Sequence, residues 1–254
     1  MEGHVTHEAR SLTAEDEAKL ARQDSSLVSE FKRNKLEADA KKNWDLFYKR
    51  NETRFFKDRH WTLREFSQLV DAGQNGKGFI LLEVGCGVGN FVFPLIEEEI
   101  GMFIYACDFS PRAVDLVKND ARYDETRIKA FTCDVTQDRW WSWKYLNYLS
   151  FLLNQNSFFF GWVFRLSSTI PEVNVDVTSM VFVLSAIHPE KFHAALENIN
   201  SVMKPGGVLI FRDYGLYDMA QIRFGPGNKL GENFYVRQDG TRYDENTFTS
   251  QFPH

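Results

Sequence analysis

The chain has few cysteines, and none of them lies in a pattern typical of a disulfide or a zinc site. Its 254 residues include only three, Cys86, Cys107 and Cys133, and no two are spaced as C-x-x-C. Few, isolated cysteines in odd number argue against a disulfide scaffold and against a cysteine zinc centre. We therefore expect no metal site, a reduced compartment (cytoplasm or nucleus), and three thiols that fill buried apolar space.

The sequence also lacks an apolar N-terminal segment and a net positive charge. Residues 1–30 are polar, without the apolar core of a signal peptide. The formal net charge of −5 excludes a globally basic nucleic-acid coat. Residues 32–64 nevertheless carry eleven basic and five acidic side chains, whereas the rest of the chain carries nineteen and thirty. This segregation favours an RNA partner. The alternative is a solvated helix face, which is what charge runs usually form.

Aromatic residues, by contrast, are abundant. Residues 140–164 hold eleven aromatic side chains and one charge, Lys144. Asn147 and the polar run 154–157 interrupt this stretch, so we expect neither a membrane span nor a membrane partner. We interpret residues 139–170 as foreign to the fold, such as translated intronic sequence or a gene-model error. A genuine family-specific insertion is the alternative, and an exposed patch of this kind would aggregate or bind a partner.

Short apolar runs alternate with helical patterns along the second part of the chain. The expected strands comprise residues 79–84, 103–107, 128–133, 175–184 and 208–212. The expected helices between them comprise residues 90–99, 111–119 and 189–203, and a turn is expected at 204–207. This alternation predicts an α/β fold with a parallel sheet and helices on both faces. Residues 1–50 are expected to be helical, with Thr13 as a helix cap.

The first expected strand ends in a glycine-rich loop. Glu83 is followed by Gly85, Gly87 and Gly89, directly before a predicted helix. Glycines at such a turn let the backbone bend sharply and let a ligand approach without a Cβ in the way. The spacing G-x-G-x-G differs from the dinucleotide fingerprint G-x-G-x-x-G, and a simple tight turn is the alternative for the glycines alone.

Acidic residues end the next two strands as well. Asp108 follows Gly87 by 21 positions, and Asp134 ends the third strand. A carboxylate at the first position can accept both hydroxyls of an adenosine ribose, and one at the second can accept from an adenine amino group. Together with the glycines, these acids predict an adenosine-containing cofactor at the carboxyl ends of the strands.

Longer motifs extend this pattern over much of the chain. They are KNWDLFY at 42–48, FFKDRHW at 55–61, LEVGCGVGN at 82–90, ACDFSPR at 106–112, FVLSAIHP at 182–189, FRDYG at 211–215 and GENFYVRQDGTR at 231–242. With these motifs the chain resembles the tRNA 3-methylcytidine methyltransferases, which are class I S-adenosylmethionine-dependent enzymes with a Rossmann-like sheet. The resemblance covers about residues 25–138 and 173–242.

The resemblance implies S-adenosyl-L-methionine as the cofactor and assigns residues to it. In that family an aromatic pair matching Trp44 and Tyr48 closes over the cofactor. The other residues matched to the cofactor site are Gly85 near the methionine part, Asp108 at the ribose, Asp134 and Val135 at the adenine, Val181 in the pocket wall, and Glu83, Gly87 and Gly89 in the glycine loop and the strand before it. Aromatic faces suit the cationic sulfonium. Ordinary helix packing is the alternative for the aromatic pair.

The expected substrate is a cytidine in an anticodon-region loop of tRNA, methylated at N3. Asp213 and Tyr214 are the candidate catalytic residues, since a nearby carboxylate stabilises charge that develops on the base; an ordinary turn or cap is the alternative. The candidates for gripping the base or its phosphates are Arg59, Trp61, Phe234, Tyr235, Arg237 and Arg242. Some family members work with an aminoacyl-tRNA synthetase, of the seryl type, which the resemblance implies as a second partner.

We therefore expect a helical segment at 1–70 that contributes to the cofactor and RNA sites, a methyltransferase domain at 71–242, and a divergent tail at 243–254. The family pattern stops near Arg242, so we expect a sheet that lacks its last two strands. Two other functions stay open. One is a non-catalytic relative that binds cofactor or a partner protein, and the other is a methyltransferase for a protein or a small molecule.

Overall fold

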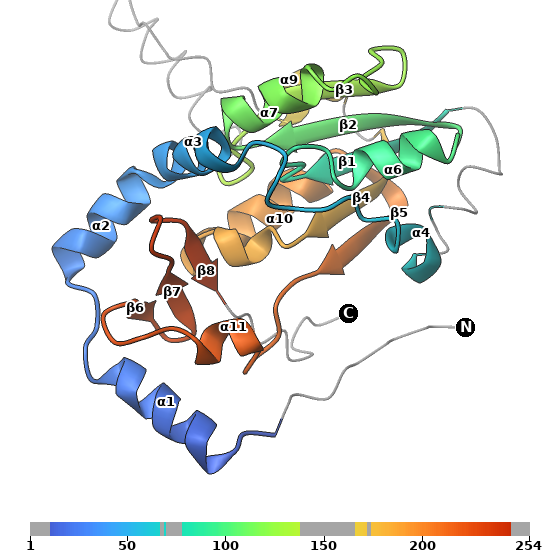
Figure 1. Ribbon diagram of the computed structural model, residues 1–254. Helices are drawn as coiled ribbons and strands as arrows, with labels where there is room; N and C mark the ends of the chain where they lie inside the picture. The colour runs from blue at the N-terminus through green and yellow to red at the C-terminus, as the bar shows by residue number, and fades with distance from the viewer. Residues whose placement is uncertain (1–10, 67–68, 70–77, 138–165, 172–173, 245–254) are drawn as a thin grey trace, which may run out of the picture. The chain divides into compact units, whose positions relative to one another are not determined.

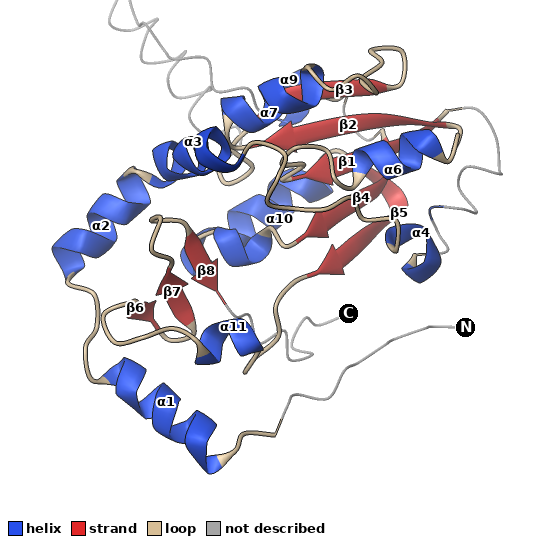
Figure 2. Cartoon of the chain, in the orientation of Figure 1, coloured by secondary structure: helices blue, strands red, loops and turns tan. Residues whose placement is uncertain are grey.

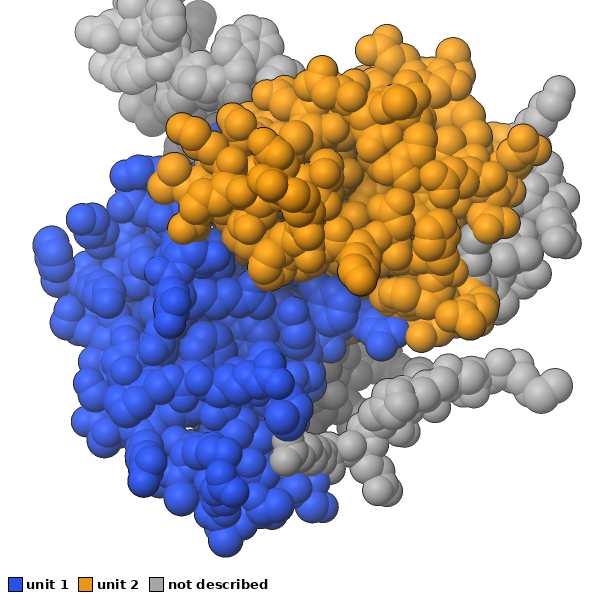
Figure 3. All heavy atoms as spheres, viewed as in Figure 1, with its two compact units in different colours: residues 1–43, 182–189, 212–254 blue, residues 44–181, 190–211 orange. Residues whose placement is uncertain are grey.

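The computed structural model describes residues 11–66, 69, 78–137, 166–171 and 174–244 (Figure 1). The chain forms two compact units, coloured separately in Figure 3. Unit 1 comprises residues 1–43, 182–189 and 212–254, and unit 2 comprises residues 44–181 and 190–211. The first boundary between the units thus lies after residue 43, whereas the predicted boundary of the N-terminal helical segment lies at residue 70.

Unit 2 is built on a five-stranded sheet with the strand order β3-β2-β1-β4-β5 (Figure 2). The strands are β1 (Phe79–Val84), β2 (Met102–Asp108), β3 (Ile128–Thr132), β4 (Val175–Val181) and β5 (Met203–Arg212). Strand β1 pairs in parallel with both β2 and β4, and β2 pairs in parallel with β3. This confirms the predicted α/β fold with a parallel sheet. The order reverses between β1 and β4, and open α/β sheets bind ligands beyond the carboxyl ends of their strands at such a point.

The helices predicted at 90–99, 111–119 and 189–203 form with shorter spans, as α6 (Val92–Glu97), α7 (Pro111–Lys118) and α10 (Phe192–Asn200). The chain also forms α3 (Ala40–Asn51), the unpredicted short helices α4 (Thr62–Glu65) and α9 (Leu166–Thr169), and the 3₁₀ turns η1 (Leu184–Ala186) and η2 (Pro189–Lys191). Helix α7 packs on β2 and β3. It begins at Ser110, whose hydroxyl accepts from the amide of Ala113, and Pro111 occupies the first turn as predicted. The turn expected at 204–207 lies inside β5 instead.

The end of the predicted insertion belongs to the core. Leu166 and Ile170 are buried, and α9 contains the first of them. Residues 139–165 lie outside the described residues, so the interpretation of that stretch stays a prediction. Cys86, Cys107 and Cys133 are buried and free, as expected.

Unit 1 holds a small antiparallel sheet that the sequence pattern did not predict. Its strands are β6 (Lys229–Gly231), β7 (Phe234–Val236) and β8 (Arg242–Asp244), and its helices are α1 (Ala14–Asp24), α2 (Glu30–Ala38) and α11 (Met219–Ile222). A capping box of Thr13 and Asp16 starts α1, which confirms the predicted cap. The predicted divergent tail is described only to Asp244, which ends β8.

Long-range hydrogen bonds explain why residues before position 44 belong with the C-terminal strands. The buried Gln23 side chain donates to the carbonyls of Gln221 at 2.8 Å and Phe224 at 3.0 Å. The amide of Val28 donates to the carbonyl of Lys229 at 2.9 Å. Within the described part of the chain, none of the helices has the length and apolarity needed to cross a membrane.

Candidate active site

The glycine loop of unit 2 needs glycine for both backbone and steric reasons. Gly85, Gly87 and Gly89 have φ values of 66°, 54° and 88°, in the left-handed region that side chains disfavour. A Cβ on Gly87 would lie 3.1 Å from the Tyr48 hydroxyl oxygen, and one on Gly89 would lie 2.3 Å from the Phe93 ring. The loop therefore brings bare backbone to the carboxyl end of β1, where a ligand can approach it.

The clash at Gly89 predicts a measurable loss of stability. Gly89→Ala should lower the free energy of unfolding, in urea denaturation, by more than Gly206→Ala does. Both glycines have φ near 80–88°, but a Cβ on Gly206 would meet nothing within 4 Å. The control variant thus carries only the backbone strain, about 1–2 kcal/mol, and the difference between the two variants measures the clash with Phe93. Equal losses would show that the Phe93 ring moves aside freely.

Asp108 ends β2 beneath this loop with its carboxylate buried. One oxygen accepts from the amide of Gly87 and the other from the amide of Ser110, both at 2.9 Å. Burial raises the pKa of Asp108 to about 6, against the lowering effect of these amide donors. A carboxylate has about four acceptor positions, so further ones remain for a ligand hydroxyl. The ribose contact of Asp108 stays a prediction.

Glu83 supplies a second buried carboxyl at the end of β1. Burial raises its pKa to about 8, and the nearby positive charge of Arg59 opposes that rise. Its Oε2 atom is buried and has no hydrogen-bond partner among the residues that the structure describes. A buried acceptor without a partner is costly, which indicates a place for a donor or a cation brought by a ligand.

The predicted aromatic pair lies on α3. The rings of Trp44 and Tyr48 are 6.0 Å apart, and Tyr48 is buried against Val88 of the glycine loop. The carboxylate of Asp45 on the same helix accepts from the hydroxyl of Ser110, the cap of α7. Asp45 therefore ties α3 to the residues beside Asp108, and the position of Tyr48 next to Gly87 follows from this tie.

The residues that follow β3 are held by contacts that sequence patterns did not reveal. Asp134 is half-buried and accepts from Thr136 and Gln137 in its own turn, which leaves acceptor capacity for a ligand. The carbonyl of Val135 accepts from Asn198 of α10 at 2.9 Å. No sequence signal pointed to Asn198, because its contact spans 63 positions.

The segment 55–61 carries two of the predicted substrate residues. The Arg59 guanidinium donates to the carbonyl of Val181 at 3.3 Å, and its charge acts on Glu83. Arg59 thus faces the predicted cofactor residues rather than solvent. Trp61 is half-buried, with its ring 6.4 Å from that of Phe66.

Asp213 and Tyr214 lie in unit 1, where Asp213 directly follows β5. The Asp213 carboxylate accepts from the amides of Ser185 and Tyr214, both at 2.9 Å, and burial raises its pKa. The buried carboxyl of Asp244 has its pKa raised to about 7 by burial and by the charge of Asp213. The Tyr214 ring contacts that of Phe182, at 4.9 Å between centroids.

The remaining predicted substrate residues of unit 1 differ from expectation in their exposure. Phe234 and Tyr235 are 6% and 1% exposed, and Tyr235 stacks on Phe224 at 4.9 Å. All three residues of β7 are buried, so these two rings pack the small sheet and offer no free face for a base. Arg242 is also buried, in an ion pair with Glu37, so its guanidinium is not exposed for contact with phosphates. Arg237 is half-buried, with its guanidinium 5.3 Å from the Tyr243 ring.

Comparison with known proteins identifies the family. A family model described as a methyltransferase domain matches residues 82–209. The human protein named tRNA N(3)-cytidine methyltransferase METTL6 is 52% identical over 236 residues, which cover 92% of this chain and 74% of that protein. The chain belongs to the tRNA N(3)-cytidine methyltransferases. This confirms the resemblance drawn from the motifs.

Two further members of the family are more distant in sequence. The Schizosaccharomyces pombe protein named tRNA N(3)-methylcytidine methyltransferase trm141 is 42% identical, over 85% of this chain and 77% of its own length. The Danio rerio protein named tRNA N(3)-cytidine methyltransferase METTL2 is 37% identical, over 88% of this chain and 65% of its own length.

Within this methyltransferase, the predicted site residues fall into two groups. Those of unit 2 are Trp44, Tyr48, Arg59, Trp61, Glu83, Gly85, Gly87, Gly89, Asp108, Asp134, Val135 and Val181. Those of unit 1 are Asp213, Tyr214, Phe234, Tyr235 and Arg237. Sequence reasoning missed Asp45, Asn90, Ser110 and Asn198, which hold the first group in place.

Proposed function

We propose that this protein uses S-adenosyl-L-methionine to methylate N3 of a cytidine in an anticodon-region loop of tRNA. The observation that carries the proposal is the pair of buried carboxyls, Glu83 and Asp108, placed on either side of bare glycine backbone. Each has acceptor capacity to offer a ligand, and they lie where parallel α/β sheets bind ligands. Membership in a family whose curated members are named for this reaction supports the choice of substrate.

The residues of unit 2 fit the proposed cofactor. The unpartnered oxygen of Glu83 suits a cationic or donor group, and the remaining acceptor positions of Asp108 suit ribose hydroxyls. The rings of Trp44 and Tyr48 suit a cationic sulfonium. When bound, S-adenosyl-L-methionine supplies an electrophilic methyl group.

Methylation at cytosine N3 does not require a strong general base from the protein. Cytosine N3 has a lone pair in the plane of its ring, so the protein need not remove a proton before attack, and orientation supplies most of the rate. The methylated base is cationic. We assign Asp213 to stabilise that charge, because a preorganised carboxylate acts most strongly away from bulk water, and Tyr214 to hold the base beside it.

Recognition of tRNA is assigned to cationic and aromatic side chains. Arg237 and the lysines and arginines of residues 32–64 suit phosphates, and Trp61 suits an unpaired base. The net charge of −5 also fits an enzyme that gains tRNA affinity from a partner. We propose an aminoacyl-tRNA synthetase of the seryl type as that partner, by family resemblance.

The decisive experiment is methyl transfer from labelled S-adenosyl-L-methionine into total tRNA, followed by nucleoside analysis. We expect label in 3-methylcytidine, with a rate that falls steeply as salt rises, since phosphate contacts release counterions. Label that enters only proteins or small molecules would refute the tRNA substrate. Binding of the cofactor without any transfer would support the non-catalytic alternative.

A further inference from the structure

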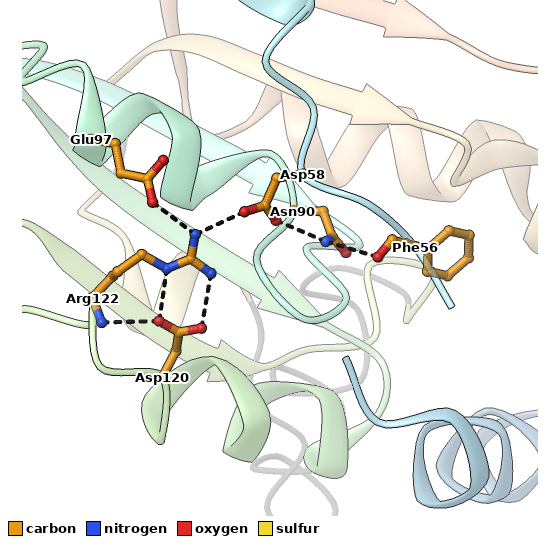
Figure 4. Close-up of polar contacts among 6 residues, drawn as sticks. All are labelled: Phe56, Asp58, Asn90, Glu97, Asp120 and Arg122. Atoms are coloured by element: carbon orange, nitrogen blue, oxygen red, sulfur yellow. Dashed lines mark hydrogen bonds and ion pairs between the residues drawn. The ribbon is translucent and has the colours of Figure 1, made fainter. Parts of the chain in front are cut away.

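Arg122 in unit 2 lies among three carboxylates, as Figure 4 shows. Its Nη1 atom donates to Asp58 at 2.8 Å and to Glu97 at 3.0 Å. Its Nε and Nη2 atoms donate to the two oxygens of Asp120, both at 2.9 Å. The guanidinium also lies over the ring of Phe93, 4.3 Å from the ring centroid. Four of its five donor positions are thus used, in a geometry that only arginine provides.

The cluster is held together by this one cation. Hydrogen bonds to Asp120 and then to Asp58 and Glu97 raise the pKa of Arg122, so it stays charged. Without the guanidinium, three carboxylates would face one another: Asp120 in the turn after α7, Glu97 at the end of α6, and Asp58 in the segment 55–61. Its side chain is 32% exposed, and surface ion pairs alone stabilise a fold little. The arrangement therefore calls for a reason beyond stability.

One arm of the cluster reaches the glycine loop. The second oxygen of Asp58 accepts from the side chain of Asn90 at 3.0 Å, and Asn90 directly follows Gly89 (Figure 4). The same Asn90 side chain donates to the carbonyl of Phe56 at 3.4 Å. The Asn90 carbonyl accepts from the amide of Arg59 at 2.7 Å. Asp58 and Asn90 thus fasten residues 56–59 to the loop.

That fastening sets the position of Arg59. The Arg59 side chain leaves the fastened segment and meets the carbonyl of Val181, and its charge acts on the buried Glu83. A chain of direct contacts therefore runs from Arg122 through Asp58 and Asn90 to the backbone of Arg59.

We propose that Arg122 is a positioning residue for the cofactor: acting through Asp58, it holds residues 56–59 against the glycine loop and keeps Arg59 beside Val181 and Glu83. The identity of the cofactor rests on the proposed function. Glu97 and Asp120 accept from the other donors of the guanidinium. Within the described residues, their side chains form no hydrogen bond or ion pair with residues 56–59.

The test is calorimetric binding of S-adenosylhomocysteine to the full chain and its variants. Arg122→Leu should weaken binding about tenfold, the scale of coupling between contacting charged groups. Arg122→Lys keeps the positive charge but not the several planar donors of the guanidinium, so it should bind S-adenosylhomocysteine more tightly than Arg122→Leu and more weakly than wild type. Glu97→Gln is the matched control, since it removes the negative charge paired with the same nitrogen on the side away from the loop, and it should leave the affinity within about twofold.

A double-mutant cycle separates positioning from general stability. Asp58→Asn should weaken binding about as much as Arg122→Leu, and the double variant should bind no more weakly than either single variant. Urea denaturation of each variant shows whether binding follows stability. Unchanged binding in Arg122→Leu, or losses that multiply in the double variant, would overturn the proposal. If Arg122→Leu does not fold, Arg122→Lys and Asp58→Asn carry the comparison.

The outcomes also distinguish this proposal from the proposed function. A wild-type protein that binds S-adenosylhomocysteine, shows the Arg122–Asp58 coupling and transfers no methyl group to tRNA would refute the substrate and leave the positioning role intact. A wild-type protein that does not bind S-adenosylhomocysteine would overturn both.

Discussion

Asp108→Asn should weaken the binding of S-adenosylhomocysteine by roughly 30- to 1,000-fold, which corresponds to about 2–4 kcal/mol. The variant keeps the shape of the side chain but loses the charge that strengthens hydrogen bonds to ribose hydroxyls. It also loses an acceptor, because one end of an amide is a donor and would face the amide of Gly87 or Ser110. Calorimetry at pH 7.5 measures the change, and unchanged affinity would refute the assignment of Asp108 to the cofactor.

Asp134→Asn is the matched control, because Asp134 also ends a strand but accepts from Thr136 and Gln137 in a half-buried turn. Its assigned contact is a neutral amino group, so its loss should be smaller, less than about tenfold. Urea denaturation of both variants separates loss of binding from loss of fold.

The raised pKa of Asp108 predicts that the affinity for S-adenosylhomocysteine depends on pH. The ionised carboxylate is the form that accepts from hydroxyls, and its pKa in the free protein is about 6. The contribution of Asp108 to the affinity should therefore be constant well above pH 6 and should fall as the pH drops below it, by about tenfold per pH unit at the limit. Asp108→Asn should lose this dependence.

The parallel sheet was predictable because buried parallel strands appear in sequence as continuous apolar runs. Phe79–Val84 is such a run and forms β1 with the predicted bounds. The antiparallel sheet of unit 1 was not predictable, since strands of three residues such as Lys229–Gly231 are too short to show a period of two. The burial of Phe234 and Tyr235, which were predicted to grip the base, follows from that sheet and was not predictable either.

The candidate site divides along the same line. Gly85, Gly87 and Asp108 were predictable because each follows directly from the end of a strand. The contacts of Asp45 with Ser110 and of Asn198 with Val135 span 65 and 63 positions, and no local pattern announces them. The hydrogen bond between Arg122 and Asp58 spans 64 positions, and no local sequence pattern predicts it either.

Asp213→Asn should lower the turnover of tRNA by about 100-fold and leave S-adenosylhomocysteine binding unchanged. Loss of one preorganised group that stabilises developing charge typically lowers kcat by 10² to 10³, approximately. The asparagine keeps the size of the side chain but has only one acceptor for the two amides of Ser185 and Tyr214, so urea denaturation of the variant checks that the fold of this turn persists. Single-turnover methylation and calorimetry on the same preparation separate the two effects.

Asp239→Asn is the control for a general loss of negative charge in unit 1. Asp239 accepts from the amide and hydroxyl of Thr241, much as Asp213 accepts from its own neighbours, but has no assigned part in the reaction. Its turnover should stay within about threefold of wild type, the scale of an ordinary surface substitution.

The protonation of Asp213 gives the assignment a second test. Burial raises the pKa of Asp213. Turnover at saturating cofactor should fall as acidification protonates Asp213, and Asp213→Asn should remove this fall because the amide does not titrate. A variant Asp213→Asn with wild-type turnover, or with binding lost as far as turnover, would instead make this carboxylate a cap for the amides of Ser185 and Tyr214.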